Sequence, residues 1–142
     1  MKVLLSVDGS EPSIRAVNYL IKASGWFKTE IEVHLLNVQH ELPYGGRVGS
    51  VLGRDAIEKY HQEQGAEQLK QARSLLDAAH VKYHAHIGVG DEASVIAAYA
   101  KDKHCDQIYM GTRGLGPVTG MVLGSVATKV IHLSPVSVLL VK

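Results

Sequence analysis

Segments typical of β-strands alternate with segments of helical period along this chain. The strand-like segments are five short apolar runs at residues 2–7, 31–38, 81–88, 107–110 and 136–141. In the intervening segments, apolar residues recur every three or four positions, which is typical of helices with one buried face. Parallel strands need such crossover helices, whereas antiparallel strands are joined by short hairpins. The pattern therefore predicts an α/β fold, in which an open, Rossmann-like parallel sheet carries helices on both faces.

Local signals predict where several of these elements begin and end. Ser10 is a candidate N-cap, Pro12 suits a first helical turn, and Gly25 ends the first helix. Asp91 opens a later helix. The run at residues 81–88 alternates apolar and polar residues, so we expect it at a sheet edge. A long helix is expected over residues 54–80, with an apolar side made of Ile57, Tyr60, Leu69, Ala72, Leu75, Leu76 and Ala79.

Composition excludes several classes of protein. The 142 residues suffice for a single domain, and 15 Lys and Arg against 14 Asp and Glu predict no broad basic surface for nucleic acid. No apolar run approaches the length of a membrane helix, and Asp8 interrupts the N-terminal run before it could serve as a signal peptide. The single cysteine, Cys105, excludes an internal disulfide and a cysteine-built zinc site. We therefore expect a cytoplasmic protein without nucleic-acid or membrane partners, in which Cys105 is a small buried side chain.

The segment after the fourth strand combines glycines with a cation and the start of a helix. It runs from Gly111 through Arg113, Gly114 and Gly116 to Gly124-Ser125-Val126. Glycines let backbone N–H groups approach an anion, because there is no Cβ to collide. A helix that begins near Gly124 adds unpaired N–H groups and the positive end of its dipole. This arrangement predicts a site for a di- or triphosphate, with Ser125 either capping the helix or donating to a phosphate oxygen.

Two common nucleotide motifs do not fit this segment. A P-loop requires Gly-Lys-Ser or Gly-Lys-Thr, and the chain contains neither. The glycines at 114, 116 and 120 are spaced one residue too widely for G-x-G-x-x-G, and they follow the fourth strand rather than the first.

The spacing Gly111-x2-Gly114-x9-Gly124-Ser125 instead resembles the ATP-binding signature of the universal stress protein family. Residues 3–10 resemble the first strand and acidic turn of that family, 106–111 the approach to its phosphate loop, and 135–141 its closing strand. The resemblance implies a sheet in the order 3-2-1-4-5. The direction of the strand order then changes between strands one and four, and open α/β sheets bind ligands at such a switch point.

The resemblance also implies ATP or another adenine nucleotide as ligand, with or without Mg²⁺. Asp8 would face the ribose hydroxyls or a Mg²⁺ ion, and the backbone of Val38 would contact the adenine edge. Ser6, Val7 and Met110 would line the pocket. The phosphates would lie against the glycine-rich turn and the start of the last helix, namely Gly111, Arg113, Gly114, Gly116, Gly124, Ser125 and Val126.

Other interpretations of these residues stay open at the level of sequence. The glycines could form only a tight strand-to-helix turn, Asp8 could cap the first helix with or without contacting a ligand, and Arg113 could be a solvated loop residue. His84 and His86 would share one strand face with His34 of the neighbouring strand. These histidines do not make a convincing metal site, so we interpret them as polar edge residues.

Three functional hypotheses follow. The first is an ATP-binding universal stress protein that regulates an unidentified partner. In this hypothesis the protein is a homodimer joined through the edge strand Val136–Val141, and residues 43–53 fold over the adenine. The second is an enzyme of related fold, such as an adenylyltransferase. Because Asp8 is the one acid beside the glycine turn, we expect no catalytic set and at most slow ATP hydrolysis. The third is a nucleotide-free interaction module.

Overall fold

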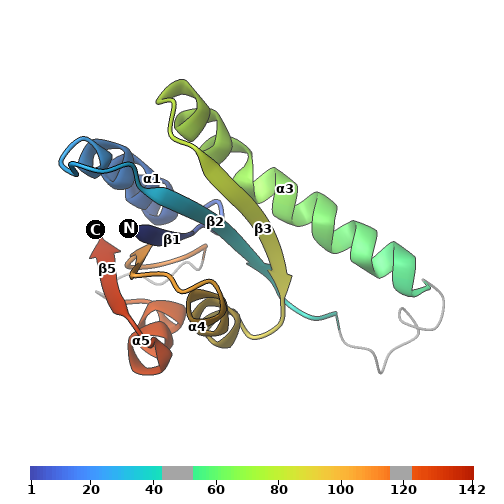
Figure 1. Cartoon of the computed structure of the whole chain (residues 1–142). Coiled ribbons are helices and arrows are strands. Elements are labelled where there is room, and N and C mark those ends of the chain that lie inside the picture. Colours follow the sequence, from blue (N-terminus) through green and yellow to red (C-terminus); the bar gives the residue numbers. More distant parts are fainter. Residues whose placement is uncertain (43–52, 116–122) are drawn as a thin grey trace.

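A computed structural model describes residues 1–42, 53–115 and 123–142. Within these residues, five parallel strands form one sheet in the order β3-β2-β1-β4-β5 (Figure 1). The strands are β1 (Lys2–Ser6), β2 (Glu32–Gln39), β3 (Tyr83–Val89), β4 (Gln107–Gly111) and β5 (Ser137–Val141). The predicted α/β class and strand order are confirmed. The strand ends differ from the predicted ones by one or two residues, as fraying ends do.

Helices cover both faces of the sheet (Figure 1). Helices α1 (Glu11–Ser24) and α3 (Arg54–Ala78) pack on one face, and α4 (Glu92–Asp102) and α5 (Ser125–Leu133) on the other. Successive side chains of a strand point to opposite faces. Val3 and Leu5 of β1 therefore join the core under α1 and α3, while Leu4 joins the core under α4 and α5. This double burial explains the unbroken apolar run Val3-Leu4-Leu5 in the middle of β1.

The predicted helix boundaries agree with the structure in most places. Ser10 is the N-cap of α1 and accepts a hydrogen bond from the Ser13 backbone N–H, and Gly25 is the C-cap. Asp91 caps α4 through the Ser94 backbone N–H at 3.1 Å. Cys105 is 4% exposed and packs in the core beneath α4 and α5, as predicted.

The predicted apolar side of α3 is wrong at Tyr60, which is 47% exposed. The buried stripe instead passes through His61 and Gly65, one residue further along the helix. A Cβ on Gly65 would lie 2.7 Å from Cγ2 of Ile87, so the glycine is what lets α3 lie this close to β3. The ring of His61 is placed by a 3.1 Å contact between its Nε2 and the backbone oxygen of His40. Histidine and glycine are not counted as apolar residues, so a search for apolar residues at helical spacing does not find His61 and Gly65.

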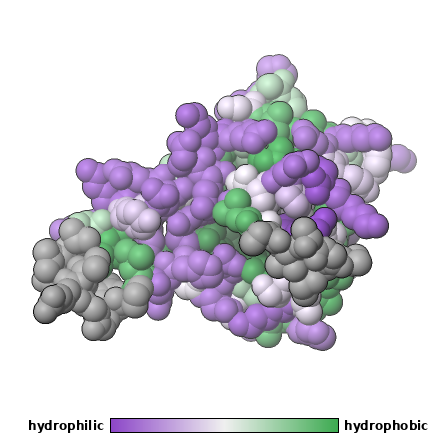
Figure 2. Space-filling model, turned by 180° about the vertical axis from the view of Figure 1, so that it is seen from behind, coloured by the Kyte–Doolittle hydropathy of each residue, from purple (hydrophilic) through white to green (hydrophobic). Residues whose placement is uncertain are grey.

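The molecular surface is predominantly hydrophilic on the face that Figure 2 presents, with apolar side chains interspersed. No helix in the described ranges is both long enough and apolar enough to cross a membrane.

An ion pair joins α4 to α5, and it yields a prediction for acid stability. Lys129 Nζ lies 2.8 Å from Asp91 Oδ1, and this contact, together with the hydrogen bonds from Ser94, lowers the pKa of Asp91 to about 2. The pKa is lower in the folded than in the unfolded chain, whose ordinary value is 3.8, so the stabilisation is complete above about pH 4 and is lost as the pH falls toward 2. Asp91→Asn keeps a capping oxygen but removes the charge.

Thermal unfolding of the wild type and of Asp91→Asn between pH 7 and pH 2 measures this effect. The melting temperature of the wild type should exceed that of the variant at neutral pH, and the two should converge below pH 4. A difference that stays constant down to pH 2 would mean that the charge of Asp91 does not contribute.

Candidate functional site

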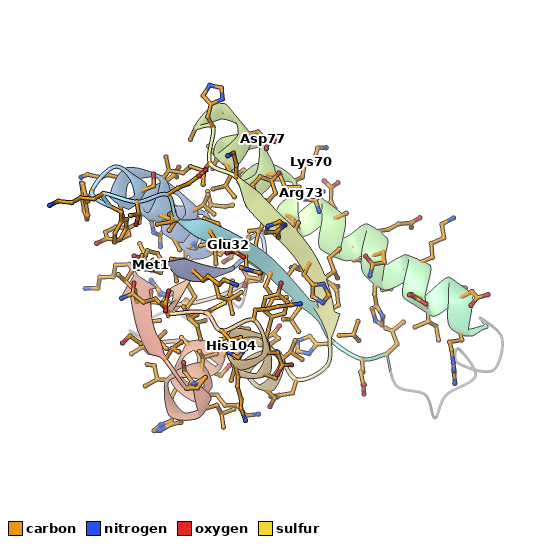
Figure 3. All side chains as sticks on the ribbon, viewed as in Figure 1. Met1, Glu32, Lys70, Arg73, Asp77 and His104 are labelled. Carbon is orange, nitrogen blue, oxygen red and sulfur yellow. The ribbon has the colours of Figure 1, made fainter. Side chains whose placement is uncertain are left out.

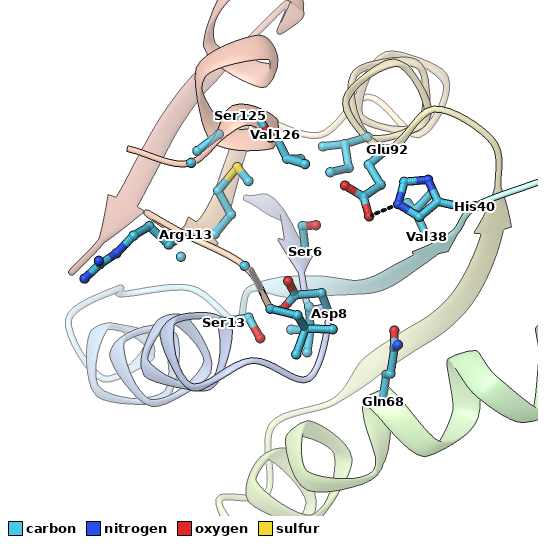
Figure 4. A pocket seen from close by; sticks show the side chains of 18 of the residues that line it. Ser6, Asp8, Ser13, Val38, His40, Gln68, Glu92, Arg113, Ser125 and Val126 are labelled. Carbon is cyan, nitrogen blue, oxygen red and sulfur yellow. Dashed lines mark ion pairs between the residues drawn. The ribbon is translucent and has the colours of Figure 1, made fainter. Parts of the chain in front are cut away.

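A pocket of about 430 Å³ opens at the carboxyl ends of β1 and β4 (Figure 4). These strands are neighbours in the sheet although they lie far apart in the chain, and the strand order changes direction between them. The pocket brings together the predicted residues Ser6, Val7, Asp8, Val38, Met110, Gly111, Arg113, Gly114, Gly124, Ser125 and Val126. Gly116, and the predicted adenine-side segment except for Gly53, lie outside the described residues.

Sequence reasoning missed several residues that also line this pocket. Gln39 and His40 directly follow the predicted Val38, and Glu92 follows the predicted cap Asp91, so their chain positions could have indicated them. No signal in the sequence points to Gln68, because it reaches the pocket only through the packing of α3 on the sheet (Figure 4). The remaining lining residues are Ser13, Ile96, Leu115 and Ala127.

The glycine turn packs tightly against the start of α1. A Cβ on Gly111 would lie 2.6 Å from the carbonyl carbon of Pro12, and one on Gly114 would lie 2.6 Å from Asp8 Oδ2. Gly111 is therefore required by packing, whether or not a ligand binds. At Gly114 the missing side chain lets the Asp8 carboxylate lie against the turn. Close packing thus accounts for glycine at both positions.

The start of α5 has neither a side-chain cap nor an acidic residue in its first turn. Its N-cap is Gly124, which has no side chain to accept a hydrogen bond, and its first turn contains no acidic residue. Ser125 is the first helical residue and not the cap, so the capping role predicted for it is wrong. An uncapped helix start of this kind attracts an anion.

Two predicted site residues take more specific roles in the structure. Asp8 Oδ1 accepts a hydrogen bond from the Ser10 backbone N–H at 2.9 Å, so Asp8 fixes the turn before α1, whereas Ser10 is the cap. The side chain of Arg113 extends away from Asp8 rather than across the pocket (Figure 4). The backbone at Arg113 approaches Gly124, whose Cβ would lie 3.3 Å from the Arg113 Cα.

A carboxylate–histidine pair lies at the opposite end of the pocket. Glu92 Oε1 lies 3.1 Å from His40 Nε2, and both side chains line the pocket (Figure 4). Burial raises the pKa of the Glu92 carboxyl, the paired His40 opposes this shift, and the charges of Asp8 and Asp91 add to it. The pocket therefore holds two carboxylates, Glu92 beside His40 and Asp8 beside Gly114.

His34 of β2 and His84 of β3 lie beside one another on one face of the sheet. His34 and His84 are register partners with ring centroids 5.6 Å apart, as the predicted shared face requires. The Nδ1 atom of His34 lies 3.0 Å from the Tyr99 hydroxyl, and its Nε2 atom lies 3.0 Å from Oε1 of Glu32, which is labelled in Figure 3. Among the described residues, no group of three or more His, Cys, Asp or Glu could hold a metal ion.

Comparison with known proteins agrees with this geometry. The sequence profile of the universal stress protein family matches residues 1–142. The chain belongs to this family. The universal stress protein MJ0531 of Methanocaldococcus jannaschii is 31% identical over 141 residues, which span 99% of this chain and 81% of that protein.

Solved structures of the family share the fold. The structure of the hypothetical protein MJ0577 superposes with a TM-score of 0.79 at 26% identity, covering 99% of this chain and 94% of that one. A universal stress protein family member from Arabidopsis thaliana, solved with AMP bound, gives a TM-score of 0.67 at 18% identity, covering 100% and 91% of the two chains. At this identity the second likeness shows the fold alone.

Proposed function

We propose that this protein binds an adenine nucleotide, ATP above all, in the pocket between β1 and β4. The observation that carries the proposal is that one pocket unites the spaced glycines at 111, 114 and 124, the uncapped start of α5 and the carboxylate of Asp8. The AMP held by the Arabidopsis thaliana family member is consistent with this ligand class. The spacing resembles that of the ATP-binding subgroup of the family.

The lining of the pocket gives the nucleotide a direction. Its phosphates lie at the glycine turn and the α5 N-terminus, where the first helical turn, beginning at Ser125, offers backbone N–H groups; the Gly124 N–H itself donates to the Thr112 carbonyl. Its base lies toward Val38, where the walls of the pocket include apolar side chains. Asp8 faces the ribose hydroxyls. A Mg²⁺ ion would be held by the phosphates with Asp8 as the protein's carboxylate, since the described residues contain no metal site of their own.

Thermal unfolding with and without millimolar magnesium-ATP tests the binding. A ligand at about 100 times its Kd stabilises the folded state by about 2.7 kcal/mol, so a rise of several degrees in the melting temperature is expected. The same concentration of magnesium chloride alone serves as the control. An equal melting temperature in both samples would contradict the proposal.

The biological role that we propose is regulatory, in the cytoplasm, with nucleotide occupancy changing the surface that meets a partner. The pocket offers Asp8 and Glu92 as carboxylates, but Glu92 pairs with His40 at the end away from the glycine turn. A general acid or base must reach the reacting phosphate, and Asp8 alone does not make such a set. We therefore expect at most slow ATP hydrolysis.

We also propose a homodimer through β5, which stands at one edge of the sheet. Its residues Val138 to Val141 are only partly buried, and an exposed apolar edge strand pairs readily with a second copy. Sedimentation at micromolar concentration should give twice the chain mass of 15.4 kDa. A monomer alone under these conditions would contradict the dimer.

A further inference from the structure

The turn that carries Asp8 lies between the end of β1 and the N-cap of α1, Ser10. Gly9 in this turn has a φ of +82°, in the left-handed region that glycine adopts without strain. Asp8 Oδ1 accepts a hydrogen bond from the Ser10 backbone N–H at 2.9 Å. This bond fixes the shape of the turn, whereas the orientation of the turn toward the pocket is set by contacts with neighbouring elements.

A buried amide of β2 holds the start of this turn. Asn37 is completely buried, and its Nδ2 donates to the backbone oxygen of Val7 at 2.8 Å. That oxygen belongs to the peptide group that joins Val7 to Asp8, and a peptide group is planar. The Val7 N–H also donates to the Leu36 oxygen of β2, at 2.9 Å. Both polar groups of Val7 are therefore tied to β2, and they fix the plane from which the backbone continues into Asp8.

Two glutamines hold the Asn37 amide in one orientation. A carbonyl oxygen can only accept, so the Asn37 atom that faces Val7 is the nitrogen. The second hydrogen of Nδ2 is donated to Gln68 Oε1 at 2.8 Å, and Asn37 Oδ1 accepts from Gln39 Nε2 at 2.6 Å. If the Asn37 amide turned over, its oxygen would face the oxygens of Val7 and Gln68. The donor to Val7 is therefore fixed in place by the amides around it.

Gln68 also packs directly against the turn. A Cβ on Gly9 would lie 3.3 Å from the Gln68 backbone oxygen and 3.4 Å from its Cα and Cβ, so α3 approaches the turn closely at this point. Gln68 and Asp8 both line the pocket, and Figure 4 shows the Gln68 side chain pointing toward the pocket from α3. The turn is thus held by β2 and α3 together, while its carboxylate lines the pocket.

We propose that Asn37, supported by Gln68, is a positioning residue that sets the Asp8 carboxylate for the ribose hydroxyls of the nucleotide. This inference rests on the proposed function, in which Asp8 faces the ribose. Asn37 is buried and does not line the pocket, so it acts through the Val7–Asp8 peptide group. Its removal should weaken recognition of the ribose and leave the phosphate end of the site, at the start of α5, unaffected.

Removal of one hydroxyl from the ribose measures how well Asp8 is placed. A hydrogen bond to a charged group changes an affinity by roughly 10- to 150-fold when one partner is removed. The wild type should therefore bind ATP at least about 10-fold more tightly than 2′-deoxy-ATP or 3′-deoxy-ATP, according to which hydroxyl Asp8 contacts. We call the larger of these two ratios of dissociation constants the ribose ratio. A variant that is only less stable loses affinity for all three nucleotides alike and keeps this ratio.

Asn37→Leu removes the amide and keeps a side chain of similar size. The Val7 oxygen then loses its side-chain donor, so the ribose ratio should fall by about 5-fold or more. Gln68→Leu keeps the Asn37–Val7 bond but removes its support, and it decides the proposal if Asn37→Leu does not fold. Because Gln68 is only partly buried, this variant should fold, and its ribose ratio should fall by about 2-fold or more.

Two further variants serve as controls. Gln68→Glu should keep the wild-type ribose ratio, because a carboxylate oxygen accepts from Asn37 as the amide oxygen does, and the added charge affects all three nucleotides alike. Leu76→Ala controls for lost stability, because Leu76 is completely buried in the core under α1 and α3 and does not line the pocket. Its ribose ratio should equal that of the wild type.

Calorimetric titration of the wild type and the four variants with ATP, 2′-deoxy-ATP and 3′-deoxy-ATP gives these ratios, and circular dichroism checks that each variant is folded. If the wild type binds ATP but does not distinguish the three nucleotides, the positioning role is refuted and ATP binding stands. The same holds if the folded leucine variants keep the wild-type ratio, or if Leu76→Ala lowers it as much as they do. A wild type that binds none of the three nucleotides refutes the proposed function as well.

Discussion

Gly124→Asp is expected to abolish ATP binding while the chain stays folded. The backbone of Gly124 is extended, with φ −75° and ψ 163°, so any residue can adopt it. Aspartate is also a favoured N-cap, and its carboxylate would accept the N–H groups at the start of α5 that we assign to the phosphates. Placing this charge against a triphosphate should weaken binding by more than about 100-fold, because like charges in contact cost several kcal/mol.

Gly124→Asn separates charge from shape in this experiment. Asparagine caps a helix about as well as aspartate and occupies similar space, but it is neutral. A Cβ at this position meets the Arg113 Cα at 3.3 Å, so both variants require the same small adjustment. Calorimetric titration with magnesium-ATP should therefore give a much smaller loss of affinity for Gly124→Asn than for Gly124→Asp. Equal affinity of Gly124→Asp and the wild type would show that the phosphates do not lie at α5.

Gly111→Ala is expected to destabilise the fold strongly. Its Cβ would lie 2.6 Å from the Pro12 carbonyl carbon and 2.8 Å from the Pro12 Cβ and carbonyl oxygen, which belong to rigid backbone and ring atoms at the start of α1. Neither partner can rotate away, so α1 or the end of β4 must move. Overpacking of this kind costs about 3 kcal/mol, which corresponds to a fall of roughly 10 °C in the melting temperature of a chain of this size.

Gly25→Ala provides the matched comparison for Gly111→Ala. The nearest atom to its Cβ would be the Lys22 carbonyl oxygen at 3.7 Å, an ordinary contact, and its φ of −71° suits alanine. Its melting temperature should therefore stay within about 2 °C of the wild type. If Gly111→Ala melts as Gly25→Ala does, then the close approach of β4 to α1 is not what requires this glycine.

The fold could be predicted because its signals are local. The apolar run Val3-Leu4-Leu5 of β1 indicates burial on both faces, and the caps Ser10 and Asp91 mark the starts of α1 and α4. The predicted buried side of α3 was wrong at Tyr60, because that side was assigned from the hydrophobicity of the residues alone. Burial on α3 depends on Gly65, which is small enough to approach Ile87, and on His61, which makes a specific backbone contact. Neither effect appears in a periodicity of apolar residues.

The site could be predicted only in part, for a related reason. The glycine turn and Asp8 follow directly after strands, and the carboxyl ends of adjacent parallel strands lie together. Gln68 has no such relation, because it sits in the middle of a long helix and reaches the pocket through tertiary packing. Gln68 also accepts a hydrogen bond from Asn37, which donates to the Val7 carbonyl as well, and no sequence pattern encodes these contacts.

The most direct test of the central claim is a calorimetric titration of magnesium-ATP into the purified, nucleotide-stripped protein. We expect micromolar binding at one site per chain. If the titration fits one binding site per chain, and if no binding heat is measured for Gly124→Asp, the nucleotide lies at the carboxyl ends of β1 and β4. If millimolar ATP produces neither heat nor thermal stabilisation of the wild type, the pocket does not bind ATP. The chain would then act as an interaction module whose glycine turn serves packing alone.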